Sequence, residues 1–143
     1  MLKLICILAI LFVQDTDWNT NKKGVVAEGY DVVSYFDGTP KNGNEQFVTT
    51  YQGGRFYFSN QVNLNKFKEK PEKYAPAYGG WCAYAMAESG DKVSIDPETY
   101  TITDGKLFLF YNRLGNNTLK PWKENESELI KKSLINWQTK YQH

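Results

Sequence analysis

Gly29-Tyr-Asp-Val-Val-Ser-Tyr-Phe36, Gly54-Arg-Phe-Tyr-Phe-Ser-Asn60 and Ala75-Pro-Ala-Tyr-Gly-Gly-Trp-Cys-Ala-Tyr-Ala-Met-Ala87 are the three motifs that decide the fold of this chain. In the first motif, Asp31 is placed to cap a short turn. Around the second motif, residues 45–51 and 55–58 are rich in aromatic and β-branched side chains. They flank a Gln-Gly-Gly turn, which predicts a hairpin.

Helices are predicted to follow this hairpin. Ser59 is a good N-cap for a helix that runs to Lys70, and Pro71 starts a further helical turn that ends at Tyr74. The glycine pair 79–80 breaks the chain before a short helix of small residues, predicted over residues 81–87.

A second hairpin is predicted downstream, because Asp104-Gly105 separates two runs of strand-forming residues, 99–103 and 106–111. Ser127 can cap a C-terminal helix whose apolar residues Ile130, Leu134, Trp137 and Tyr141 have helical spacing. This order of elements predicts an α+β fold, in which a small antiparallel sheet built from two hairpins packs with short helices and a C-terminal amphipathic helix.

The first 19 residues are predicted to be a signal peptide, because Lys3 precedes an unbroken apolar run, residues 4–13, that is too short to span a bilayer. The cut is expected between Val13 and Asn19. The domain then covers residues 20–143, and the protein is periplasmic or secreted. The alternative is an uncleaved signal segment, which would be the only link to a membrane.

Composition narrows the function classes. The formal net charge is +1 with acids and bases mixed along the chain, so nucleic acid is not an expected partner. His143 is the only histidine, which removes a Ser-His-Asp triad, a Cys-His dyad and multi-His metal sites within one chain. Removal of Cys6 with the leader would leave Cys82 as the only cysteine of the mature chain, so an intramolecular disulfide is excluded there.

The order and spacing of these motifs resemble the YHS domain family, in the form carried by small secreted bacterial proteins. The downstream run from Ile95 to Asn112 fits the family's second hairpin. A cysteine-rich branch of the family is similar to treble-clef metal modules and is associated with copper handling. The positions that match its thiolates are Ser34, Ser59 and roughly Asn63, so the resemblance does not carry that metal site over to this cysteine-poor chain.

Cys82 and Met86 are a candidate metal pair. Four residues separate them, so a helix over residues 81–87 would place both sulfurs on one face. Cys and Met suit Cu(I), which makes copper the metal that this pair favours. Two ligands on one helix form an incomplete site, however, and the alanines and aromatics around Cys82 equally indicate core packing. A redox thiol is the third reading.

Two aromatic clusters are candidate binding residues for a small ligand. Tyr30, Asp31 and Tyr35, together with Tyr84, could hold a ligand through their oxygens; alternatively, Asp31 caps a turn and the tyrosines satisfy buried backbone groups. The tyrosines and tryptophan around Pro76 and the glycine pair could line an aromatic groove or form core: Tyr74, Tyr78, Trp81 and Tyr84.

The leading hypothesis is therefore an exported, non-enzymatic binding module for a metal ion or small ligand. The alternative is a small protein-interaction module that serves an export or metal-resistance system. A thiol-dependent enzyme with Cys82 or Asp31 as its reactive group is the third hypothesis, and the sequence does not decide whether the protein is an enzyme.

Overall fold

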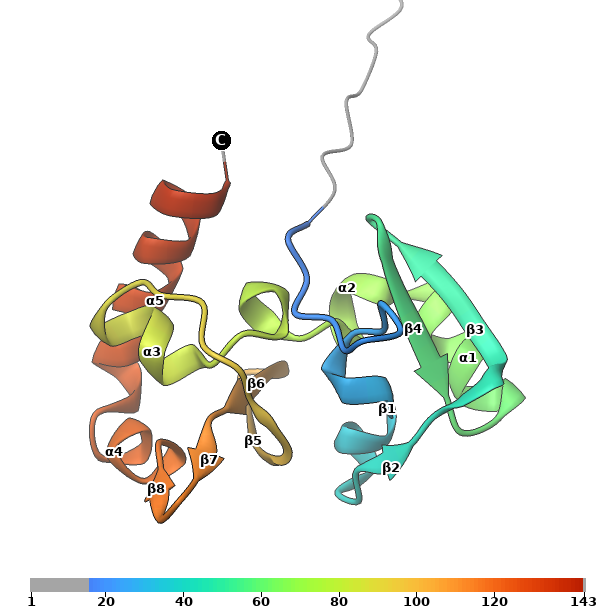
Figure 1. The fold of residues 1–143 in the computed structure, drawn as a ribbon, viewed down its shortest axis with the longest axis horizontal. Coiled ribbons are helices and arrows are strands. Elements are labelled where there is room, and N and C mark those ends of the chain that lie inside the picture. The colour runs from blue at the N-terminus through green and yellow to red at the C-terminus, as the bar shows by residue number, and fades with distance from the viewer. Residues whose placement is uncertain (1–15, 143) are drawn as a thin grey trace, which may run out of the picture.

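The computed structural model describes residues 16–142. Most of the predicted signal peptide, residues 1–15, lies outside the described part. The chain forms two halves that lie side by side (Figure 1). The first half contains strands β1 to β4 and the helices α1 and α2, and the second contains strands β5 to β8 and the helices α3 to α5.

Within residues 16–142, the strands pair antiparallel in four separate two-stranded sheets: β1 with β2, β3 with β4, β5 with β6 and β7 with β8. Their bounds are β1 Tyr30–Asp31, β2 Lys41–Asn42, β3 Asn44–Tyr51, β4 Gly54–Phe58, β5 Asp96–Thr103, β6 Lys106–Phe110, β7 Asn112–Arg113 and β8 Asn116–Asn117. Both predicted hairpins and the α+β class are confirmed. The two long hairpins form separate two-stranded sheets rather than one shared sheet.

The helices are α1 Gln61–Glu69, α2 Pro71–Tyr74, α3 Ala83–Glu88, α4 Leu119–Glu124 and α5 Glu126–Tyr141. Three short 3-10 turns accompany them: Ala27–Gly29, Ser34–Asp37 and Ala77–Gly80. Among residues 16–142, no helix combines the length and the apolar character needed to cross a membrane.

Three helix starts differ from the prediction. The N-cap of α1 is Asn60, whose side chain accepts a 2.8 Å hydrogen bond from Asn63 N, because Ser59 is engaged elsewhere. The short helix α3 begins at Ala83, so Cys82 is its N-cap residue rather than part of it. Helix α5 begins at Glu126 after Asn125, one residue before the predicted cap Ser127.

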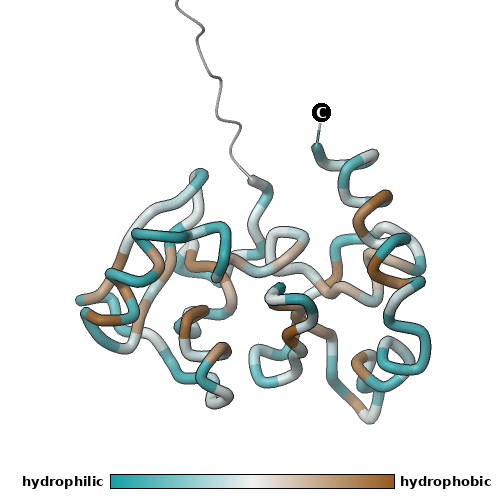
Figure 2. The backbone as a smooth tube through the Cα atoms, turned by 180° about the vertical axis from the view of Figure 1, so that it is seen from behind, coloured by the Kyte–Doolittle hydropathy of each residue, from teal (hydrophilic) through white to brown (hydrophobic). Residues whose placement is uncertain are grey.

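Two hydrophobic cores meet at strand β6. Leu107 and Leu109 pack into a first core with the strands and helices of the first half, while Phe108 and Phe110 pack into a second core with α3, α4 and α5. Successive side chains of a strand point to opposite faces, so this short strand separates the cores and joins the halves. Figure 2 shows hydrophobic stretches in both halves.

A four-residue segment, Thr16–Asn19, also ties the halves together. Trp18 packs edge-on against Phe56, with ring centroids 5.1 Å apart. The backbone N–H of Asn19 donates to Gly79 O at 2.8 Å, and Trp81 Nε1 donates to Asp17 O at 2.9 Å. These last residues of the predicted signal peptide are therefore packed against the domain.

Candidate functional site

The predicted turn after Tyr30 is built on the carboxylate of Asp31, which is completely buried. Its Oδ1 accepts hydrogen bonds from the backbone N–H groups of Val33 and Ser34, at 2.9 and 3.2 Å. Its Oδ2 accepts three more, from Ser59 N, Ser59 Oγ and Asn63 Nδ2, at 2.7 to 2.9 Å. Five donors satisfy this carboxylate, so its role here is to cap and connect backbone segments.

Tyr30 and Tyr35 lie beside this turn, with ring centroids 6.5 Å apart. Tyr35 is buried, and its hydroxyl donates a 2.5 Å hydrogen bond to Pro97 O. Burial raises the pKa of Tyr35 far above its ordinary value, and burial together with the charges of Glu98 and Asp96 raises that of Tyr30. Both phenols are therefore neutral near pH 7, and the hydroxyl of Tyr35 is committed to satisfying a backbone carbonyl.

Trp81 and Tyr84, the other two candidate ligand-binding residues, belong to the second half and are each partly buried. The indole of Trp81 is bonded to Asp17 O, and the pKa of Tyr84 is raised by burial and by the charge of Glu88. Tyr30, Asp31 and Tyr35 thus lie on one turn of the first half, whereas Trp81 and Tyr84 come from the second half.

Cys82 and Met86 are both completely buried. Cys82 belongs to the first core, where its Sγ accepts a 3.3 Å hydrogen bond from Tyr111 N and lies 3.5 Å from Thr118 Oγ1. Met86 belongs to the second core. The two sulfurs thus pack into different cores, and these positions favour the packing role over a shared metal site.

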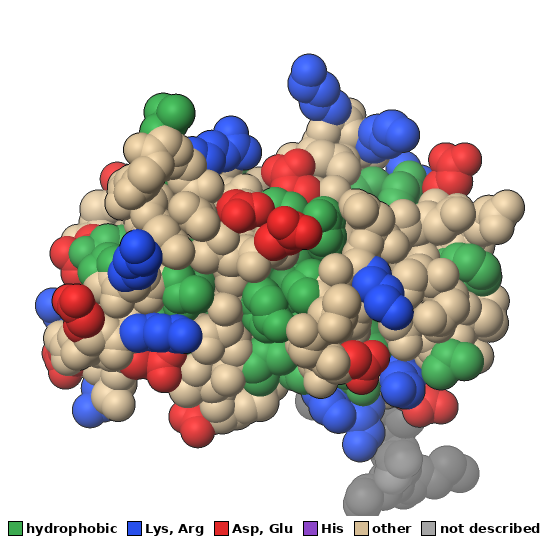
Figure 3. Space-filling view, turned by 90° about the horizontal axis from the view of Figure 1, so that it is seen from below, with side chains coloured by type: hydrophobic (Ala, Val, Ile, Leu, Met, Phe, Trp, Pro, Cys, Tyr) green, Lys and Arg blue, Asp and Glu red, His purple; other side chains and the backbone are tan. Residues whose placement is uncertain are grey.

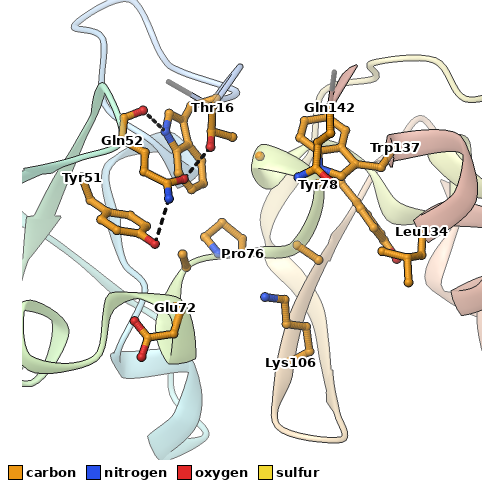
Figure 4. Close-up of a pocket in the computed structure, with 14 residues that line it drawn as sticks. Thr16, Tyr51, Gln52, Glu72, Pro76, Tyr78, Lys106, Leu134, Trp137 and Gln142 are labelled. Carbon is orange, nitrogen blue, oxygen red and sulfur yellow. Dashed lines mark hydrogen bonds between the residues drawn. The ribbon is translucent and has the colours of Figure 1, made fainter. Parts of the chain in front are cut away.

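A groove between the two halves is lined by both aromatic and polar side chains (Figure 4). It has a volume of about 230 Å³, and a second cavity of about 230 Å³ continues it along β6 and α5. Both cavities are lined by Ala77, Tyr78, Lys106 and Leu134. The remaining walls of the first cavity are formed by Thr16, Trp18, Tyr51, Gln52, Glu72, Ala75, Pro76, Gly79, Trp137 and Gln142.

The backbone that forms one wall of the groove is constrained. Tyr78 has φ +57° and Gly79 φ +62°, the left-handed region that a bulky residue such as tyrosine rarely adopts. Tyr78 is held there by its hydroxyl, which is 2.5 Å from Ser133 Oγ of α5. Because Ser133 Oγ donates its own proton to Ile130 O, the tyrosine is the donor to the serine.

Polar groups meet this apolar wall from two sides. Gln52, opposite α5, accepts a 2.7 Å hydrogen bond from Thr16 Oγ1 and donates a 3.2 Å bond to the Tyr51 hydroxyl. Lys106 extends toward the middle of the groove from the start of β6 (Figure 4). Lys106 is exposed as a residue, but its ammonium group is partly desolvated by the groove, which lowers the pKa of Lys106 below its ordinary value. The groove therefore combines aromatic walls with a few convergent polar groups, which is typical of small-molecule sites.

The family model of the YHS domain matches residues 32–78. This chain contains a YHS domain. No curated protein and no solved structure matches the chain significantly. The YHS domain match begins one residue after Asp31 and ends at Tyr78, so the strained wall of the groove is the end of the matched segment. Lys106, Leu134 and Trp137, on the other wall, lie beyond it.

The residues of this YHS domain do not fit the metal that the cysteine-rich branch implies. The three positions that match the thiolates converge: Ser59 and Asn63 donate to the carboxylate of Asp31, and Ser34 Oγ donates to its backbone oxygen at 2.6 Å. Hydroxyl and amide groups are poor ligands for soft metals. Within residues 16–142, there is no group of three or more His, Cys, Asp and Glu side chains that could hold a metal ion.

Sequence reasoning pointed to part of the groove and missed the rest. The aromatic run around Pro76 and the glycine pair indicated a possible groove, and Pro76, Tyr78 and Gly79 do line one. Lys106 and Gln52 were missed, because each is an ordinary polar residue next to a hairpin turn. The turn residues next to Gln52 and Lys106 predict where the strands end. They do not predict which cavity the side chains of Gln52 and Lys106 line.

Proposed function

We propose that this YHS domain protein is an exported binding module that takes up a small organic ligand in the groove between its two halves. The observation that carries the proposal is the lining of the groove. Tyr51, Tyr78 and Trp137 supply aromatic surface, and Gln52 and Lys106 supply polar groups that can orient a ligand. Sites of this composition are common where two structural units meet.

The size of the groove supports a small ligand. Small-molecule sites have volumes of roughly 300 to 1,000 Å³. The first cavity alone, at about 230 Å³, falls just below that range, and its continuation along β6 and α5 extends the space available.

The strained wall supports the same location. A left-handed conformation at a buried tyrosine costs about 1 to 3 kcal/mol and persists only where surrounding contacts enforce it. Here the enforcing contacts are the Ser133 hydrogen bond and the Thr16–Asn19 segment packed on Gly79. Such strain concentrates at sites of function.

Export remains part of this proposal, on the strength of the apolar run near the N-terminus. Cleavage is proposed before Thr16, because Thr16–Asn19 belong to the packed domain.

A second candidate is an interaction module. Its supporting observation is Leu114, which is fully exposed at the tip of the β7–β8 hairpin with φ +52°. Glycine or asparagine is the residue expected at such a turn position, so a leucine there suggests contact with a partner.

The groove proposal is tested by filling the cavity. Leu134 lines the groove and is 46% exposed, while its neighbour Ile135 is 61% exposed on the same helix and lines neither cavity of the groove. Leu134→Trp should occupy the groove, and Ile135→Trp is the matched control. Binding of 2-naphthol, a flat neutral probe, is measured by saturation-transfer NMR. The proposal predicts transfer in wild type and Ile135→Trp that is lost in Leu134→Trp. Equal transfer in all three proteins, or none in wild type, would overturn it.

A further inference from the structure

We propose that the ligand of the groove is a small amphiphilic monocarboxylate whose carboxylate pairs with the ammonium group of Lys106. This inference rests on the proposed function of the groove as a ligand site. It adds the charge of the ligand and the apolar character of its body. Neither property follows from the YHS domain match.

Lys106 occupies the junction of the two cavities. It lines both, together with Ala77, Tyr78 and Leu134, and Figure 4 shows it reaching toward Pro76 from β6. A negative group held at this point would therefore be in contact with both cavities, and the rest of the ligand could extend from it in either direction.

Within residues 16–142, Asp17 and Lys92 form the only ion pair, so no described carboxylate is paired with the ammonium group of Lys106. Glu72 also lines the first cavity, but it lies on the opposite side of the groove from Lys106 (Figure 4). Asp104 lines the second cavity from the exposed hairpin turn. Lys106 is an exposed residue at the start of β6, but the groove partly desolvates its ammonium group and lowers its pKa. A cation that lines both cavities and forms no ion pair with the described residues favours an anionic ligand.

The charge of that anion is limited to one. A single lysine can compensate a monoanion, whereas a phosphate monoester brings nearly two negative charges. Glu72 on the opposite wall would repel the additional charge. A monocarboxylate therefore suits the groove better than a phosphate.

The body of the ligand is expected to be apolar. Apart from Lys106, the second cavity is walled mainly by Phe108, Ile130, Leu134 and the ring of Tyr78, and polar groups enter it only from the turn at Thr103 and Asp104. Each methylene group buried against such walls strengthens binding by about fourfold. Affinity should rise with chain length until the cavity is filled.

The test is calorimetric titration of the protein at pH 7 with octanoate, butanoate, octan-1-ol and octylamine. The variants are Lys106→Met, which keeps the aliphatic stem, and Lys120→Met, a control on the exposed surface of α4. Octanoate should bind at least about tenfold more tightly than octan-1-ol. Lys106→Met should remove that advantage without weakening octan-1-ol, and Lys120→Met should leave it unchanged.

The inference is overturned if octylamine binds as tightly as octanoate, or if octanoate binds Lys106→Met and wild type equally. If octan-1-ol and 2-naphthol still compete for the groove in that case, the proposed function stands and only the ligand class is wrong. If no probe binds wild type, both proposals fall together.

Discussion

The side-chain amide of Asn63 donates a 2.7 Å hydrogen bond to Oδ2 of Asp31, across 32 positions of sequence. The same oxygen accepts the two hydrogen bonds from Ser59. The turn after β1 is thereby fixed to the first turn of α1. Ser59 and Asn63, two positions matched to thiolates of the cysteine-rich branch, serve here as hydrogen-bond donors to Asp31.

Replacement of Asp31 by alanine should therefore destabilise the fold strongly. Two side-chain donors and three backbone N–H groups would lose their acceptor in a buried site, and we expect a loss of about 3 to 5 kcal/mol in the free energy of unfolding. Asp37, on the same turn but exposed, is the control, and Asp37→Ala should stay within about 0.5 kcal/mol of wild type. Urea denaturation measures both. A loss below about 1 kcal/mol for Asp31→Ala would contradict the role given to this carboxylate.

The wall of the groove is predicted to be intolerant of a side chain at Gly79. Both Gly79 and Gly115 have positive φ, but a Cβ at Gly79 would lie 2.6 Å from Asp17 O, whereas Gly115 faces open space. Gly115→Ala should cost about 1 kcal/mol through its backbone conformation alone. Gly79→Ala should cost about 3 kcal/mol, because Thr16–Asn19 must also move. Thermal unfolding compares the two variants, and equal losses would show that this packing contributes little.

Cys82 is predicted to be unreactive in the native state, because its side chain is completely buried. In a Cys6→Ser background, a thiol reagent should label Cys82 at least about a hundredfold more slowly than a cysteine introduced at the exposed Ser89. Labelling should become rapid in denaturant. Fast labelling of the native protein would contradict this prediction and show that the thiol of Cys82 is reactive.

Binding of octanoate should weaken with rising pH, and earlier than an ordinary lysine would cause. Burial lowers the pKa of Lys106, so its charge is lost below the usual lysine range, while octanoate stays ionised. Tyr51 and Tyr78 also line the groove, but burial raises the pKa of each, so both remain neutral over this range. Glu72 and Asp104 also line the two cavities. Calorimetry between pH 7 and 10 measures the profile. A profile that is unchanged in Lys106→Met would assign the effect to another group.

Turn-forming and helix-starting residues in the sequence predicted the two long hairpins and most of the helices. Asp104-Gly105 and Gln52-Gly53-Gly54 marked the two long hairpins, and Pro71 marked the start of α2. The N-cap of α1 was wrong by one residue because Ser59 and Asn60 are both good caps, and only the tertiary bond to Asp31 decides between them. Competition of this kind cannot be resolved from local preferences.

The candidate site was harder to predict, since its residues come from distant segments. Tyr78 was recognisable as part of an aromatic run, but its opposite wall is formed by Tyr51 and Gln52, and Lys106 comes from another hairpin. The pairing of Cys82 with Met86 depended on both residues being helical. Because α3 begins at Ala83 and the sulfurs enter different cores, that spacing does not bring them to one cavity.

Charge on the surface agrees with the mixed pattern of the sequence. On the face shown in Figure 3, basic and acidic side chains are interspersed around a hydrophobic patch.

The central claim is that a ligand enters the groove between the halves, and chemical-shift mapping tests it most directly. Backbone amide resonances of the ¹⁵N-labelled protein are followed during titration with 2-naphthol. The account predicts that the largest shifts fall on Ala77, Gly79, Lys106 and Leu134, from the two walls of the groove. Shifts centred on the turn from Tyr30 to Tyr35, or no shifts at millimolar probe, would contradict it.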